Sequence, residues 1–430
     1  MITESKMESV SQVTDASTFD WELQSRVVCD LNEWKDQYEE IQEFVVSPDG
    51  EKIAAIIKTE EDLFCPCVNG EVWENTFEKA WSLRFGPDGR LYCLVMNDDA
   101  WTVAVDDQLW EDTYDYVWNL CINPNGRGAA ANVRTSEGYG AVLNGESWET
   151  KFIEARNCEV SKDGSRVAIA IQISPLAEGD IFEFRKGLWS LAVDGTAWGR
   201  SFLNLWGFAF SDTGQSVAAE VRLDPNTQSI AVDGEPWMPG FKAVWEPVFV
   251  PGSNSVIAPA LTPEGWKLLI DGKPLWTRGF YQLWHQKFAP DGKKVAAILS
   301  PEFGYWTVGI DGVPWKTLFS DVALEPVFSG DSSRVAAVVR DQGQWSIAVD
   351  GAKWNAQFDM AWNPVFSPDG RKVAARAAIG SSEFIFMNEK QIWEACQFVW
   401  DPVFSPDGGE LLVRYVQGGK YCRKVVPVAK

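Results

Sequence analysis

The chain has 430 residues, of which 46% are hydrophobic and 23% charged, which is typical of a globular protein long enough to bury a large core. Its net charge of −23 argues against nucleic-acid binding, because phosphate backbones require patches of Lys and Arg. Direct binding to an anionic lipid surface is disfavoured for the same reason. No stretch of about 18 apolar residues occurs, so we expect no direct membrane insertion.

The first segment, residues 1–20, is polar and acidic, and we expect it to be a flexible tail ahead of a folded domain over residues 21–430. It has no apolar region of the kind found in secretory signals, so we expect a cytoplasmic protein. The eight cysteines are irregularly spaced, and in that compartment we expect reduced thiols.

Ten tryptophans recur at a nearly constant interval from residue 34 to residue 393. The spacing is 37–39 residues except for one step of 50 residues between Trp148 and Trp198. A period this regular indicates a repeated supersecondary unit. Periodic aromatic residues usually form a core, so we interpret this ladder as packing between neighbouring repeats. Its members are Trp34, Trp73, Trp110, Trp148, Trp198, Trp237, Trp276, Trp315, Trp354 and Trp393.

Each repeat contains two turn signals that separate short β-like runs. The copy WNPVFSPDGRKVAAR begins at Trp362, and QWSIAVDGAKW ends at Trp354. In SPDG the proline presets φ for a tight turn, and in VDG the Asp-Gly pair tolerates the positive φ of a two-residue hairpin. The runs between the turns predict four strands, named a, b, c and d. Four-stranded meanders at this period are typical of the blades of a β-propeller.

The two ends of the chain carry partial repeats. Residues 21–40 resemble strands c and d alone, and residues 400–415 resemble strands a and b, followed by YCRKVVPVA as an additional strand. We therefore expect the two half-blades to pair and close the propeller, which removes exposed sheet edges. About ten blade-equivalents result, arranged either as one large ring or as two smaller propellers of about five blades.

The 50-residue step comes from an insertion between strands b and c, over residues 172–189. In a propeller the b–c and d–a connections emerge on the same face. The insertion carries Ile181, Phe182 and Phe184 between charged residues, and exposed apolar loop residues indicate binding. We predict that these three residues contact a protein partner. The alternative is that they fold back onto an extended hairpin.

No catalytic or cofactor motif is evident. His285 is the only histidine, lies inside the repeat frame and has no nucleophile elbow beside it. Cys65 and Cys67 lack the two-residue spacer of zinc and iron–sulfur loops, although a metal site there is left open. The repeated Asp residues are explained by turn chemistry, without calcium. We expect neither a cofactor nor a metal site, and no enzyme activity. A pair of converging carboxylates is the alternative left open.

Two resemblances follow from these features. PVFSPDGRKVAA resembles the WD40-like repeat of TolB-type propellers, and this likeness implies the fold but not the function. A tryptophan-rich, acidic propeller of this length also resembles the TmcD family, the tryptophan-rich cytoplasmic subunits of the Tmc transmembrane redox complexes of sulfate-reducing bacteria. That likeness implies an accessory subunit, at the inner face of the cytoplasmic membrane, that docks beside membrane and iron–sulfur subunits.

The prediction from sequence is therefore a non-catalytic scaffold of a membrane-associated electron-transfer complex, which acts by protein–protein docking. One alternative is a carbohydrate-binding or glycoside-active propeller, which would place exposed tryptophans beside two carboxylates. The other is a general assembly scaffold unrelated to redox chemistry. The sequence leaves open the blade count, the identity of the partners and the face that binds them.

Overall fold

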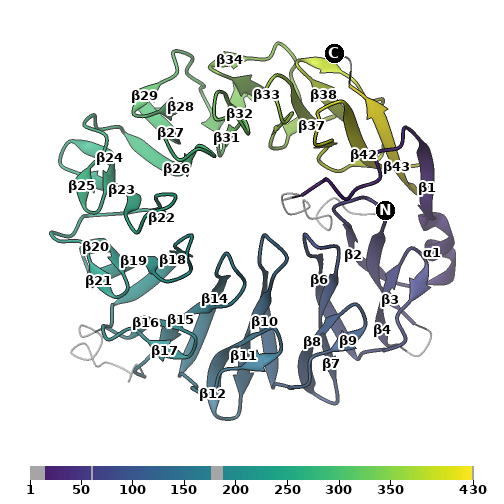
Figure 1. The fold of residues 1–430 in the computed structure, drawn as a ribbon, viewed down its shortest axis with the longest axis horizontal. Coiled ribbons are helices and arrows are strands. Elements are labelled where there is room, and N and C mark those ends of the chain that lie inside the picture. The colour runs from purple at the N-terminus through teal and green to yellow at the C-terminus, as the bar shows by residue number, and fades with distance from the viewer. Residues whose placement is uncertain (1–14, 60–61, 176–186, 429–430) are drawn as a thin grey trace. The chain divides into compact units, whose positions relative to one another are not determined.

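The computed structural model describes residues 15–59, 62–175 and 187–428. Over these residues the chain forms ten antiparallel sheets and one short helix, α1 (Leu31–Gln37). In three sheets the first strand is interrupted and is counted as two strands. The protein is a β-propeller with ten four-stranded blades, as the repeat predicted (Figure 1).

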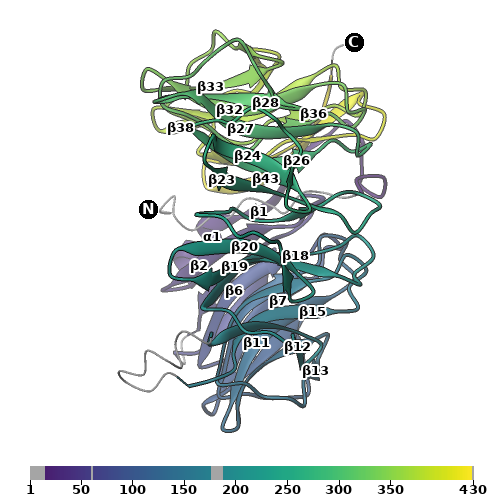
Figure 2. The ribbon, with the colours of Figure 1, turned by 90° about the vertical axis from the view of Figure 1, so that its left-hand side faces the viewer.

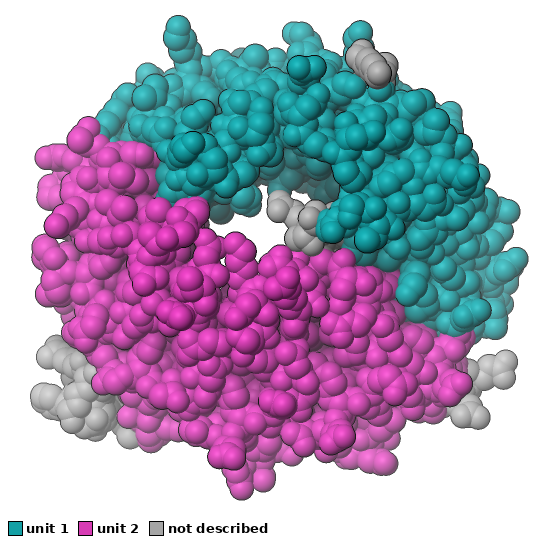
Figure 3. Space-filling view, in the orientation of Figure 1, with its two compact units in different colours: residues 1–57, 67–71, 278–430 teal, residues 58–66, 72–277 magenta. Residues whose placement is uncertain are grey.

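The chain divides into two compact units, coloured separately in Figure 3. Unit 1 contains residues 1–57, 67–71 and 278–430, and unit 2 contains residues 58–66 and 72–277. The sheet formed by β2 (Ile41–Val46), β3 (Ile53–Lys58), β4 (Phe64–Val68) and β5 (Glu71–Val72) has residues in both units.

Unit 2 contains five complete sheets, each a meander in chain order. Their strands are β6 (Lys79–Phe85), β7 (Leu91–Asn97), β8 (Ala100–Val105) and β9 (Gln108–Leu109); β10 (Tyr116–Ile122), β11 (Ala129–Thr135), β12 (Gly138–Leu143) and β13 (Glu146–Ser147); β14 (Glu154–Val160), β15 (Val167–Gln172), β16 (Trp189–Val193) and β17 (Thr196–Ala197); β18 (Asn204–Phe210), β19 (Val217–Asp224), β20 (Thr227–Val232) and β21 (Glu235–Pro236); and β22 (Val248–Phe249), β23 (Val256–Thr262), β24 (Gly265–Ile270) and β25 (Lys273–Pro274).

Unit 1 contains the other four complete sheets. Their strands are β26 (Gln282–Phe288), β27 (Val295–Glu302), β28 (Tyr305–Ile310) and β29 (Val313–Pro314); β30 (Val322–Ala323), β31 (Val327–Phe328), β32 (Val335–Asp341), β33 (Gln344–Val349) and β34 (Ala352–Lys353); β35 (Met360–Ala361), β36 (Val365–Phe366), β37 (Val373–Ile379), β38 (Ser382–Met387) and β39 (Lys390–Gln391); and β40 (Phe398–Val399), β41 (Val403–Phe404), β42 (Glu410–Gln417), β43 (Lys420–Pro427) and β1 (Ser25–Asp30).

Strand b of each blade is buried on both faces, which explains its continuous apolar run. In β32, Ala337 and Val339 pack into the core shared with β27 and β28. Ala336 and Val338 alternate with them and pack into the core shared with β37. Small residues therefore recur on strand b because two neighbouring sheets approach it, one from each side.

Strand a leaves the regular ladder at one repeated position. In β26 the register shifts between Trp284 and Lys287, where His285 has a φ of 53°. In the β30–β34 sheet the interruption contains Pro326, which has no N–H to donate to a ladder. The bulge in one blade and the proline in the other both interrupt the ladder of strand a, and both bend the strand.

As predicted, the closing sheet pairs strands from both ends of the chain, but the contribution of each end differs from the prediction. Residues 21–40 do not supply strands c and d. They supply only strand d, β1, which pairs with β43. The C-terminal strand β43 takes the place of strand c. The helix α1 follows β1 in the chain (Figure 1, Figure 2). The side chain of Asp30 accepts a hydrogen bond from the Asn32 N–H, and this cap starts α1.

Contacts in unit 1 secure this closing sheet. The Tyr421 hydroxyl donates to the Gly50 carbonyl at 3.0 Å, and Arg423 Nε donates to the Asp49 carbonyl at 3.0 Å. Arg414 Nη1 donates to the Pro48 carbonyl at 3.1 Å. The closing blade is therefore held to the first SPDG turn by side chains that are themselves buried.

Candidate functional site

The ladder tryptophans lie at the seams between blades. Six of the ten are less than 10% exposed and the other four are half-buried. Trp34 lies on α1 and not after a c–d turn, yet it is 3% exposed. Several of them face the glycine of a neighbouring c–d turn. A Cβ built on Gly351 would lie 3.3 Å from Cγ of Trp315, so glycine leaves room for the indole.

A recurring hydrogen bond fixes the ladder positions that follow a c–d turn. The backbone N–H of Trp315 donates to the Val308 carbonyl on strand c at 2.8 Å, and Trp354 donates to Ile347 in the same way. A strand-c hydroxyl completes the arrangement, as Ser346 Oγ donates to the Ala356 carbonyl at 2.8 Å. This uniform geometry makes the ladder part of the frame that positions the loops on the other side of each blade.

The repeated Asp residues have structural hydrogen bonds. Asp350 has a φ of 51°, and its carboxylate accepts from the Val335 N–H at 2.9 Å. In the SPDG-type turns, Ser329 Oγ donates to Asp331 Oδ1 at 2.5 Å, and this bond with those from Ser333 lowers the pKa of Asp331 to about 2. Turn geometry accounts for these carboxylates, as the sequence suggested.

Cys65 and Cys67 both lie on β4 and are fully buried. Cys65 Sγ donates to the Asn75 carbonyl at 3.2 Å, which is the role that Ser346 plays in its own blade. Burial raises the pKa of Cys67 to about 12. Among the described residues no group of three or more His, Cys, Asp or Glu side chains is placed to hold a metal ion.

The structure places His285 at the strand-a bulge described above, exposed to solvent. Its neighbours Trp284 and Gln286 belong to the repeat frame. The Trp284 ring packs against Trp306 with centroids 4.7 Å apart. The structure thus gives His285 a backbone role at the bulge.

Residues Ile181, Phe182 and Phe184 lie outside the described residues, but the base of their insertion is described. The insertion leaves β15 after Gln172 and returns at β16. A pocket of about 640 Å³ lies beside this base, and Ile153 and Ile173 at its rim are 44% and 38% exposed. Its lining residues come from the b–c loop of the preceding blade, from the d–a connection that follows that blade and from the base itself, and include Arg134, Glu137, Tyr139, Lys151, Phe152 and Gln172.

A second apolar feature, in unit 1, lies on the b–c loop of the β26–β29 blade. Phe303 at the loop tip is 84% exposed, and its ring meets that of Tyr281 edge-on at 6.1 Å. Tyr281 is 58% exposed and Tyr305, at the start of β28, is 46% exposed. We call Tyr281, Phe303 and Tyr305 the aromatic trio. Large apolar side chains gathered this openly are typical of binding surfaces.

The corresponding loops of two other blades are closed by carboxylates. In the β35–β39 blade, Asp359 accepts from the Gly380 N–H at 2.7 Å. In the β30–β34 blade, Asp321 accepts from the Gly343 N–H at 2.7 Å. Tyr281 stands at the place of Asp359, immediately after the repeated Phe. The trio therefore replaces a structural hydrogen bond with exposed apolar surface.

Two carboxylates approach each other in unit 2. Desolvation, with a smaller contribution from Glu246, raises the pKa of Glu220 on β19 to about 7. Glu246 follows Trp245, which is 39% exposed and stacks on Trp266 with ring centroids 5.4 Å apart. Arg222 lies over the Trp206 ring at 5.3 Å. The sequence showed none of these pairings, because they join different strands.

Unit 1 contains a buried ion pair between strands b and c of one blade. Arg376 and Glu383 are 4% and 7% exposed and form two hydrogen bonds of 2.9 and 2.7 Å. Glu383 also accepts from the Val399 N–H, and the Arg376 guanidinium lies 3.9 Å from the Trp362 ring centre. Through the Val399 N–H the pair links the β35–β39 sheet to β40, and its desolvation offsets much of the attraction between the two charges.

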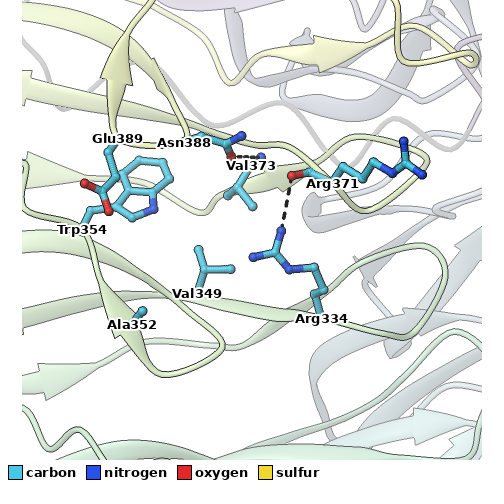
Figure 4. Close-up of a pocket in the computed structure, with 8 residues that line it drawn as sticks. All are labelled: Arg334, Val349, Ala352, Trp354, Arg371, Val373, Asn388 and Glu389. Carbon is cyan, nitrogen blue, oxygen red and sulfur yellow. Dashed lines mark hydrogen bonds between the residues drawn. The ribbon is translucent and has the colours of Figure 1, made fainter. Parts of the chain in front are cut away.

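Pockets also recur at the blade seams, one of which is shown in Figure 4. It measures about 310 Å³ and is lined by Trp354, Asn388 and Glu389, and by Arg334, which donates to the Arg371 carbonyl. In unit 2, Trp110, Asn144 and Arg90 line a corresponding pocket of about 380 Å³. Because these pockets recur at equivalent positions in different blades, we interpret them as a consequence of how neighbouring blades pack.

No helix among the described residues is long and apolar enough to cross a membrane. No protein-family model matches the sequence, and no curated protein matches it.

Solved structures with similar folds include a eukaryotic initiation factor, at 15% identity and a TM-score of 0.48, over 76% of this chain and 89% of that chain. A Dos1 propeller matches at 12% identity and a TM-score of 0.37, over 76% and 93%. The tricorn protease matches at 12% identity and a TM-score of 0.31, over 88% of this chain and 51% of that one. Likenesses this distant carry no inference about activity or partners.

Proposed function

We propose that this protein is a non-catalytic docking scaffold whose b–c loops bind a protein partner. The exposure of Phe303, 84%, is the observation that carries the proposal. A phenylalanine held open to water at the tip of a short hairpin loses apolar hydration when a partner covers it. Because the hairpin is already ordered, the entropic cost of binding is low.

The partner surface should be apolar with a basic rim. Glu302 is exposed directly beside Phe303, and the chain has a net charge of −23. Complementary charge at the rim of an interface accelerates association and selects among partners, whereas the aromatic centre supplies most of the affinity.

The resemblance to TmcD-family subunits supports a more specific form of the proposal. The scaffold would belong to an electron-transfer complex and reach the inner face of the cytoplasmic membrane through membrane and iron–sulfur subunits. Purification of the tagged protein in mild detergent, with mass spectrometry and assays for haem and iron, tests this form. Recovery of those subunits is the expected result. A colourless protein recovered alone would contradict membership of a redox complex.

Paired variants locate the docking residues. Tyr281→Ser with Phe303→Ser should abolish partner recovery if the aromatic trio is the dock. Phe182→Ser with Phe184→Ser tests the insertion in the same way. Val313→Ser is the matched control, because Val313 lies on β29 of the same blade as the trio and is 69% exposed. Recovery that survives both pairs of changes would contradict docking through the b–c loops.

A second candidate is carbohydrate binding, supported by Trp245, which is 39% exposed and precedes Glu246, a residue that acts electrostatically on Glu220. Exposed indole rings stack on sugar faces, and two carboxylates bind hydroxyl groups or act in glycoside hydrolysis. A screen of oligosaccharides by tryptophan fluorescence tests it, with Trp245→Ala as the variant. A fluorescence change that Trp245→Ala removes would support this alternative, and no change with any sugar would reject it.

A further inference from the structure

The eight cysteines fall into two classes of exposure. Six are buried, whereas Cys121 and Cys158 retain partial access to solvent. All eight lie within the described residues. The two accessible cysteines are also neighbours, although 37 positions separate them in the chain.

Their strands bring them together within unit 2. Cys121 lies on β10 and Cys158 on β14, which are the first strands of two consecutive sheets. Cys121 Sγ donates a hydrogen bond to the Cys158 carbonyl oxygen at 3.2 Å. Both side chains pack against the core cluster between these two sheets.

The repeat register explains why the thiols face each other. When the two repeats are aligned, the segment WNLC (residues 118–121) corresponds to RNCE (residues 156–159). Cys158 therefore stands one place earlier in its repeat than Cys121 does. Cys158 lies inside the bulge of β14, between Arg156 and Glu159, whereas Cys121 resumes the ladder after the bulge of β10. The position of Cys121 points toward the following blade, as does the equivalent Arg84, which donates to the Leu120 carbonyl. Cys158, one place earlier in its repeat, packs toward the preceding sheet, which contains β10.

The surroundings give the two thiols unequal acidity. The hydrogen bond from the Cys158 thiol lowers the pKa of Cys121, and Arg84 adds to this effect. The same hydrogen bond, together with burial, raises the pKa of Cys158. Because the thiolate is the nucleophile, the lower pKa favours Cys121 as the attacking group and leaves Cys158 as the resolving group.

We infer that Cys121 and Cys158 form a redox-active dithiol that is oxidised by low-molecular-weight disulfides. The Cys121 thiolate attacks one sulfur of the disulfide, forms a mixed disulfide and releases the other half as a thiolate. Cys158 then loses its proton to solvent and attacks Cys121 Sγ. This step forms the Cys121–Cys158 bond and releases the second half as a thiolate, so the added disulfide is reduced to two thiols. The inference is independent of the proposed docking function.

The test is to treat the reduced, full-length protein with oxidised glutathione. Peptide mass mapping without a reducing agent then identifies the cysteines that have reacted. We expect a cross-linked peptide pair containing Cys121 and Cys158, with the loss of two hydrogens and no change at the buried cysteines. Cys158→Ser should stop at a stable glutathione adduct on Cys121. Cys121→Ser should slow the reaction of Cys158 by at least about tenfold, since the better nucleophile is gone.

Cys93→Ser is the matched control, because Cys93 is a buried strand cysteine of the same unit. It should leave the cross-link unchanged. A stable glutathione adduct on the wild-type protein, a cross-link to another cysteine, or no reaction at either thiol would overturn the inference.

Discussion

The two sides of each blade differ in how closely they follow the repeat. On the side of the a–b and c–d turns, Asp350 and its equivalents adopt the same positive φ and the same hydrogen bond to strand b. On the side of the b–c and d–a loops, one blade closes its hairpin with Asp359 whereas another exposes Phe303. Repeated residues therefore build the frame, and departures from the repeat mark the surface available for function.

The largest effect should come from the uniform side. Trp315→Ala removes an indole packed over Gly351 and should lower the free energy of unfolding by about 3–5 kcal/mol. Urea unfolding followed by circular dichroism measures it. The control Val313→Ser, two residues away and 69% exposed, should change stability by less than about 0.5 kcal/mol. Equal unfolding curves for Trp315→Ala and the wild type would show that the ladder is not part of the frame.

Glu383→Gln tests the buried pair that lies within the otherwise apolar frame. It leaves the Arg376 guanidinium without its partner charge and should cost about 3–5 kcal/mol. The double variant Arg376→Met with Glu383→Leu should recover most of that loss, since neither charge remains buried. A double variant as unstable as Glu383→Gln would contradict this explanation.

The stability of the protein should also depend on pH through Glu220. Its pKa in the folded protein is about 7 and its ordinary value is 4.5, so the folded state holds the proton more tightly. That contribution is fully present below about pH 4.5 and is lost as the pH rises through about 7. Glu220→Gln should therefore flatten the pH dependence and gain about 1–2 kcal/mol near pH 8 relative to the wild type. An unchanged slope would show that Glu220 is not desolvated.

The smallest effect on stability should come from the variable side. Phe303→Ser removes a side chain that is 84% exposed and should alter the free energy of unfolding by less than about 0.5 kcal/mol. The same change should reduce partner binding strongly. A large loss of stability would place Phe303 in the frame and contradict its role as a free contact surface.

The fold was predictable because its signals are local and repeated. Turn residues and apolar runs recur in every blade, so each copy supported the others. The prediction for the closing blade was partly wrong, because residues 31–37 form a helix and not a strand. The start of this helix depends on the Asp30 cap. The C-terminal strand β43 forms strand c of this blade, a strand that the prediction had assigned to residues 21–40.

The candidate sites were less predictable, since they depend on side chains from different strands. Phe303 looked like one more loop residue in SPEFGYW, and only its exposure and its contact with Tyr281 distinguish it. The one-place offset between Cys121 and Cys158 was present in the repeat alignment. Its meaning required knowing that β10 and β14 lie in consecutive sheets.

Site-specific photo-crosslinking in cells tests the central claim most directly, with a photoreactive phenylalanine analogue placed at Phe303 or at Val313. Both positions are exposed on the same blade, at 84% and 69%, one on a b–c loop and one beside a c–d turn. We expect position 303 to crosslink to the partner that copurifies with the tagged protein, and position 313 not to do so. Crosslinks to that partner from position 313, or from both positions equally, would contradict the assignment of docking to the variable side.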